Sequence, residues 1–168
     1  TVLCPSNFAE LRTMLRRAVN EIKGPVAIRY PRGGEGTYKA DSGRDNLVVL
    51  REGEDITLCA YGMMINNVLD AAELLERRGM RARVVKINAN SPLYDRDMRE
   101  VVGKTKAMLV AEECAGVGCM GQRMAAILEW NHIAPERMEL CNLGKAFPAQ
   151  GSTEELQREF GLDAESLV

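Results

Sequence analysis

The sequence is poor in the residues that most often build metal centres and catalytic triads. It has a single histidine, His132, and no serine or cysteine forms a recognisable nucleophile motif to pair with it. Cys114 and Cys119 are spaced too widely for a usual zinc knuckle. We therefore expect no catalytic triad built on His132 and no metal site within this chain.

Long apolar runs and blocks of like charge are also missing. No run reaches the length that a membrane-spanning helix needs, and the formal net charge is only -2. The chain does not begin with methionine, and residues 1–5 lack the charged and apolar regions of a signal peptide. These features predict no membrane partner and no nucleic-acid partner.

The cysteines are odd in number and scattered through apolar segments, which is unlike a disulfide framework. We expect buried free thiols that pack as small hydrophobic side chains, and a cytoplasmic protein. The five positions are Cys4, Cys59, Cys114, Cys119 and Cys141.

The first 33 residues form a short unit of strand, helix and strand. Residues 2–3 predict a strand, apolar residues at helical spacing predict a helix over 6–22, and 26–30 predict a short buried strand. Ser6 or Asn7 can cap the helix. Residues 34–46 are rich in glycine and polar residues and have no apolar period, which predicts a linker.

Strand and helix patterns alternate through residues 47–168, which predicts an α/β domain with a mainly parallel sheet. Right-handed crossovers would place helices on both faces. At 163–168 the pattern resembles the capped first turn of a helix that then stops, so a fragment of a longer polypeptide is expected. The expected strands are 47–50, 56–61, 82–87, 108–111 and 138–143, and the expected helices are 63–78, 94–102, 118–130 and 153–160.

Two segments carry a resemblance to a known family. GPVAIRYPRG at 24–33 and GSTEELQREFGLDAE at 151–165 resemble the transketolase family, and most closely its 1-deoxy-D-xylulose-5-phosphate synthases. REGEDITLCAYGMMINNVLDAAELL at 51–75 and VAEE at 110–113 also resemble that family. Departures occur in NANSPLYD at 88–95, GCMGQ at 118–122 and LGKAF at 143–147.

The resemblance implies a domain plan and a reaction. Residues 1–33 would end a pyrimidine-binding domain, 34–46 would be a linker, and 47–168 would be a transketolase C-terminal domain. The complete enzyme would use thiamine diphosphate and Mg²⁺ to transfer a two-carbon unit from pyruvate to glyceraldehyde 3-phosphate. The catalytic and cofactor-binding residues would precede Thr1, so this part would be inactive alone and would need the upstream domains, in a homodimer.

The resemblance assigns one site residue, Arg32, which would bind the phosphate of the sugar phosphate substrate. A guanidinium between glycines at a strand end suits bidentate phosphate binding. Arg29 and Tyr30 would support it. The residues alone favour a different interpretation, in which Arg29 and Arg32 pair with carboxylates or cover a domain edge, and the resemblance reverses that preference only for Arg32.

Other features have structural interpretations that we prefer. Glu112 and Glu113 end a predicted strand and could form an acid–base pair, but a hydrogen-bonding corner or a subunit contact is favoured. The glycines in CAGVGCMG at 114–121 are a weak nucleotide signal without an acidic ribose partner. Trp130 and the Met120–Met124 stripe are interpreted as core or interface.

Two other functions stay open. The chain could be a non-catalytic assembly or regulatory module, since some motif residues of the family are lost. It could also belong to a split transketolase that uses sugar phosphates, or to a 2-oxo-acid dehydrogenase beta subunit.

Overall fold

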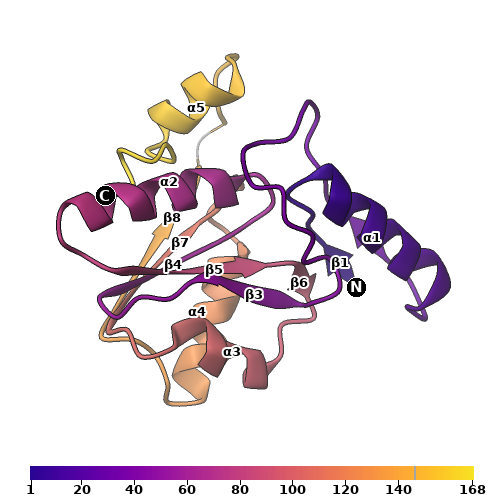
Figure 1. Ribbon diagram of the computed structural model, residues 1–168, viewed down its shortest axis with the longest axis horizontal. Helices are drawn as coiled ribbons and strands as arrows, with labels where there is room; N and C mark the ends of the chain where they lie inside the picture. Colours follow the sequence, from indigo (N-terminus) through magenta and orange to yellow (C-terminus); the bar gives the residue numbers. More distant parts are fainter. Residues whose placement is uncertain (146) are drawn as a thin grey trace.

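The computed structural model describes residues 1–145 and 147–168, so one residue of the 143–147 segment lies outside the description. Its centre is a five-stranded sheet in the order β3-β5-β4-β7-β8 (Figure 1). Strands β5, β4, β7 and β8 run parallel, and β3 pairs with β5 antiparallel at the edge. The mainly parallel sheet is thereby confirmed. The strands are β3 (Leu47–Arg51), β4 (Ile56–Tyr61), β5 (Ala82–Ile87), β7 (Ala107–Ala111) and β8 (Arg137–Cys141).

Helices cover both faces of this sheet, as the sequence predicts. Helix α2 (Met64–Arg77) lies on one face with α5 (Thr153–Glu159) beyond it, and α3 (Asp95–Val102) and α4 (Met120–Trp130) lie on the other (Figure 1). Gly79, with a φ of 83°, follows α2 in the left-handed conformation that glycine adopts readily. Within the described residues, no helix is both long enough and apolar enough to span a bilayer.

The two faces of the sheet bury separate cores because strand side chains alternate. In β4, Leu58 packs into the core beneath α2, which also receives Leu162 from the C-terminal segment. The neighbouring Cys59 packs into the core beneath α3 and α4, together with Met124. The interpretation of Met120 and Met124 as core residues is confirmed, since both are buried.

The N-terminal unit contains β1 (Val2–Leu3), α1 (Phe8–Asn20) and β2 (Ala27–Ile28). Strand β1 pairs parallel with β2 on one side and antiparallel with β6 (Ala89–Ser91) on the other. The sequence did not predict β6. A strand within 26–30 is confirmed by β2, but its expected burial is wrong, because β2 lies at the edge of this small sheet and has one exposed and one half-buried residue. Through β6, the N-terminal unit is hydrogen-bonded directly to the larger domain.

Candidate functional site

The segment after β2 lies beside the C-terminal ends of the central strands β4 and β7. Arg29 donates from Nη1 to the Tyr61 hydroxyl at 2.7 Å and from Nη2 to the Glu113 carbonyl at 2.9 Å. Its guanidinium carbon lies 5.1 Å from the centroid of the Tyr61 ring, within cation–π range. Since Tyr61 ends β4 and Glu113 follows β7, Arg29 bridges the N-terminal unit to two central strands. It does so through a hydroxyl and a carbonyl, and not through a carboxylate.

A hollow of about 230 Å³ opens beside this bridge. Arg29 and Tyr30 both line it, and Tyr30 is 63% exposed. Arg32 does not line it, so the structure does not gather the three predicted site residues around one cavity. The lining consists of Arg29, Tyr30, Pro31, Tyr61, Gly62, Met63, Met64 and Glu113.

Arg32 itself lies in an exposed turn just beyond Pro31. It forms no hydrogen bond or ion pair with the residues that the structure describes, so its guanidinium is available to an anion from outside. Gly33 follows with a φ of 117°, which a residue with a side chain rarely adopts. Glu35 holds the far end of the turn, because its Oε2 accepts the Phe8 backbone N–H at 2.7 Å.

A second hollow, of about 320 Å³, shares Arg29 and Tyr61 with the first in its lining. It brings Arg123 of α4 to the same space as Arg29. The sequence did not predict this grouping, because Arg29 and Arg123 are far apart along the chain. The lining consists of Val2, Arg29, Tyr61, Asn90, Cys114, Ala115, Val117, Gly118, Cys119, Met120 and Arg123.

Glu112 is a buried capping group at the start of α4. Its two carboxylate oxygens accept the backbone N–H groups of Met120 at 2.9 Å and Gly121 at 2.7 Å, and its side chain is almost fully buried. A negative charge here is stabilised by the positive end of the helix. The interpretation of Glu112 as a hydrogen-bonding corner is confirmed. Glu113 is half-buried, and its side chain accepts a hydrogen bond from Gln157 of α5.

The Cys114 thiol and the Tyr61 hydroxyl lie near Glu112 and have raised pKa values. Burial, with the Glu112 charge second, raises the pKa of Cys114 to about 11 and raises that of Tyr61 as well. Burial also raises the pKa of Cys4 to about 11, although Arg29 partly opposes the shift. These thiols are therefore protonated near neutral pH and are weak nucleophiles.

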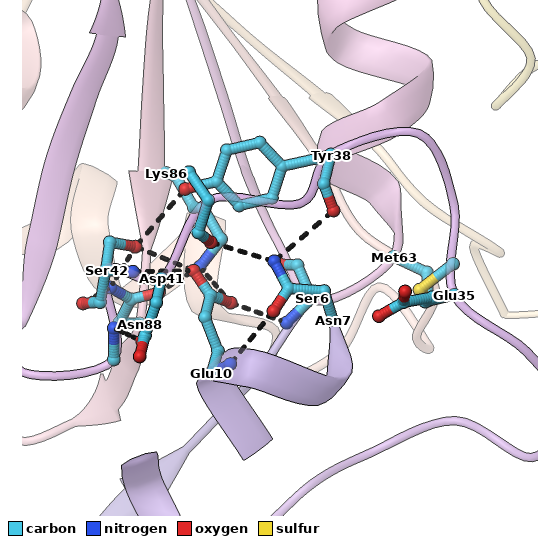
Figure 2. Close-up of polar contacts among 12 residues, drawn as sticks. Ser6, Asn7, Glu10, Glu35, Tyr38, Asp41, Ser42, Met63, Lys86 and Asn88 are labelled. Atoms are coloured by element: carbon cyan, nitrogen blue, oxygen red, sulfur yellow. Dashed lines mark hydrogen bonds and ion pairs between the residues drawn. The ribbon is translucent and has the colours of Figure 1, made fainter. Parts of the chain in front are cut away.

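A buried polar cluster holds α1 and the following loop against β5 (Figure 2). Glu10 and Lys86 are both fully buried and form an ion pair at 3.0 Å. The other Glu10 oxygen accepts the Ser42 hydroxyl at 2.7 Å, and the Asn88 amide donates to the Ser42 carbonyl at 2.7 Å. Lys86 also contacts the Asn88 side-chain oxygen. This cluster holds Ser42, which lies in the loop that follows Arg32, between α1 and β5.

The same cluster determines where α1 begins. The Asn7 side chain accepts the Glu10 N–H at 2.9 Å and donates to the Ala40 carbonyl at 2.8 Å. Of the two caps that the sequence offers, the structure uses Asn7. A lysine within the otherwise apolar VVKI of β5 was the sequence signal for a buried ion pair, and it was missed.

Comparison with known proteins identifies the family. Residues 45–167 match the family described as "Transketolase, C-terminal domain". The chain belongs to the transketolase C-terminal domain family. The match covers well over half of the chain and includes every strand of the large sheet.

Relatives of this transketolase-family chain are similar over its whole length. A Chlorobaculum tepidum protein named 1-deoxy-D-xylulose-5-phosphate synthase is 36% identical over 99% of the chain, and one of the same name from Desulforudis audaxviator is 32% identical over 99%. The chain spans about a quarter of their length, 27% in both cases.

Solved structures agree with the fold. A protein described as "Split gene transketolase, inactive beta4 tetramer" has a TM-score of 0.86 and 31% identity, and the match covers 99% of this chain and 54% of that one. A Pichia stipitis transketolase has a TM-score of 0.74 at 18% identity, covering 99% of this chain and 24% of that one, which supports the fold alone.

Several sequence interpretations can be checked in this transketolase-family domain. All five cysteines are free, and Cys4, Cys59 and Cys119 are buried as expected. Trp130 is 84% exposed, so its interpretation as a core residue is wrong, and its place in an interface stays a prediction. His132 is an exposed loop residue with a φ of 53°.

A metal-bound cofactor does not fit the side chains that the structure describes. In residues 1–145 and 147–168, no group of three or more histidine, cysteine, aspartate or glutamate side chains is placed to hold a metal ion. Hard cations such as Mg²⁺ are held by carboxylates together with phosphates. Any such site in a complete enzyme would therefore need ligands from other segments.

Proposed function

We propose that this chain is the C-terminal portion of a 1-deoxy-D-xylulose-5-phosphate synthase and is inactive alone. The observation that carries the proposal is similarity to proteins of that name over essentially the entire chain, while the chain spans only 27% of their length. The complete enzyme would join a two-carbon unit from pyruvate, after loss of CO2, to glyceraldehyde 3-phosphate. It would be a cytoplasmic homodimer.

The domain plan that we propose follows the sequence. Residues 1–33 would close a pyrimidine-binding domain, residues 34–46 would link it onward, and residues 47–168 would form the transketolase C-terminal domain. The match of the family to residues 45–167 supports the last boundary. Upstream domains would provide the thiamine diphosphate and Mg²⁺ sites, and the cofactor would supply the carbanion chemistry.

Arg32 would bind the phosphate of the acceptor. It is exposed, lies in a turn held at one end by Arg29 and at the other by Glu35, and has no partner among the described residues. A guanidinium on a turn held in this way can make two parallel hydrogen bonds to a phosphate. Arg29 and Tyr30 would support it by position, Arg29 through its bridge to Tyr61 and Tyr30 as a wall of the adjoining hollow.

A kinetic experiment tests this role. The chain is expressed with its upstream polypeptide, and pyruvate consumption is measured against glyceraldehyde 3-phosphate. Arg32→Ala should raise the acceptor KM by roughly 10- to 100-fold with a small change in kcat, since a hydrogen bond to a charged group contributes about 1.5–3 kcal/mol. Arg12→Ala, at an exposed position on α1, is the matched control and should change neither constant. An unchanged acceptor KM for Arg32→Ala would remove this residue from the site.

A second candidate is the corresponding part of a split transketolase. The 31% identity and the TM-score of 0.86 to the split-gene protein favour it. The reconstituted enzyme would then use a ketose phosphate as the donor and would not consume pyruvate. Stable assembly with activity toward neither donor would favour a non-catalytic assembly module instead.

A further inference from the structure

The order of the strands creates a switch point between β4 and β7. From β4 the chain crosses to β5 on one side and later to β7 on the other. In open α/β sheets, the connections then leave in opposite directions, and ligands bind in the crevice outside the ends of those strands. Tyr61 ends β4 and Glu112 follows β7, so the 320 Å³ hollow described above lies at this point.

We propose that this hollow binds a small phosphate monoester between Arg29 and Arg123. Each guanidinium has five N–H donors. Arg29 uses two N–H groups in its contacts with Tyr61 and Glu113, and Arg123 uses Nη1 to reach the Asn90 carbonyl at 3.0 Å. Both residues therefore keep donors for an anion while their side chains are held in place.

The charge balance of the hollow favours an anion. Its lining, within the part of the chain that the structure describes, contains two arginines and no carboxylate. The buried Glu112 lies behind this lining, and its oxygens already accept the N–H groups of Met120 and Gly121. Because Glu112 occupies the start of α4, the arginines and not the helix end would hold the phosphate.

The remaining walls define the organic part of the ligand. Val2, Val117 and Met120 present apolar surface, and the volume of about 320 Å³ is at the lower end of the range for small-molecule sites. A phosphate with a compact apolar body matches this lining better than a free inorganic ion. Arg32 does not line the hollow, so this site is independent of the role proposed for Arg32.

Phenyl phosphate is a suitable probe, with phenol and inorganic phosphate for comparison. Binding to the 168-residue chain is followed by two-dimensional NMR of its backbone amides. We expect saturable shifts at Val117 and Gly118, weaker binding of inorganic phosphate, no binding of phenol, and weaker affinity at higher ionic strength. Arg123→Gln should weaken binding of phenyl phosphate at least tenfold, as loss of one charge-assisted contact implies.

Two control variants make the result decisive. Arg137→Gln removes an exposed arginine at the N-terminal end of β8. This end lies opposite the strand ends that border the hollow, so the variant should leave the affinity unchanged. Arg32→Ala should also leave it unchanged, which separates this site from the proposed acceptor site. The proposal is overturned by an absence of shifts, by shifts confined to residues 30–35, or by equal weakening in Arg123→Gln and Arg137→Gln.

Discussion

Replacing Glu10 by glutamine should destabilise the protein strongly at neutral pH. Glu10 and Lys86 are both fully buried, and their charged groups lie 3.0 Å apart. Glutamine keeps an oxygen that can accept from Ser6 or Ser42, but it leaves the lysine charge buried without a counterion. Removing one partner of a buried pair costs about 3–5 kcal/mol. With typical slopes for urea unfolding, the midpoint should fall by roughly 2 M.

The loss of stability in Glu10→Gln should become smaller as pH rises. Burial lowers the pKa of Lys86 from its usual 10.5, and Glu10 partly offsets that shift. In Glu10→Gln the offset disappears, so the folded-state pKa falls further while the unfolded-state pKa does not change. Between these two values the unfolded chain binds more protons, and stability therefore rises with pH. The deficit relative to the parent should therefore shrink as pH rises from the folded-state pKa of Lys86 in the variant to its higher value in the parent.

Urea unfolding followed by far-ultraviolet circular dichroism, at several pH values, measures both effects. Glu21→Gln is the matched control, because Glu21 pairs with Arg44 at 3.3 Å on the exposed surface and should contribute less than about 1 kcal/mol. A Glu10→Gln variant within about 1 kcal/mol of the parent would refute the reasoning. So would a deficit that does not change with pH.

Three further predictions concern other parts of the fold. Glu112→Ala should lower the free energy of unfolding by about 1–3 kcal/mol, because it leaves buried N–H groups without acceptors. Hydrogen exchange of the Met120 amide should accelerate, and unchanged exchange would contradict the capping role of Glu112. Cys114 should react slowly with iodoacetamide near neutral pH and faster as pH approaches 11, since its pKa is raised to about 11; rapid labelling at neutral pH would contradict this. Ser152→Ala should cost about 1 kcal/mol, measured by urea unfolding, because Ser152 and Glu155 form a capping box at α5; Thr153→Ala, inside the helix, is the comparison.

The sequence predicts the large sheet well because its strands carry a strong local signal. The apolar runs of β4 and β5 coincide with the predicted ranges 56–61 and 82–87. These strands are largely buried on both faces, and mainly apolar segments of that length are typical of parallel sheets, although Arg83 and Lys86 interrupt the apolar pattern of β5. The helix ends were also close to prediction, since α2 ends before Gly79 and α5 begins after Ser152.

Strand β6 could not be predicted in the same way. Its sequence, Ala-Asn-Ser, has three residues and neither a β-branched nor an aromatic side chain. It becomes a strand because β1 pairs with it, and that pairing joins residues 2–3 to residues 89–91. Tertiary context, which no local pattern contains, therefore determines this element.

The candidate site was predictable only in part. The RYPRG segment predicts Arg29, Tyr30 and Arg32 as site residues, yet their different surroundings depend on the three-dimensional fold. Arg29 reaches Tyr61 and Glu113, which are distant along the chain, whereas Arg32 stays exposed. The convergence of Arg29 and Arg123 on one hollow likewise depends on where the sheet places its loops.

Because β1 lies between β2 and β6, the protein should tolerate cleavage of its backbone in the loop that follows α1. A cut between the exposed Arg44 and Asp45 would leave both products joined by backbone hydrogen bonds of β1 to β6 and by the Glu10–Lys86 pair. The nicked molecule should stay assembled, and the two separate polypeptides should complement each other when they are mixed. Gene fission at this loop would therefore preserve the architecture on which neighbouring segments depend.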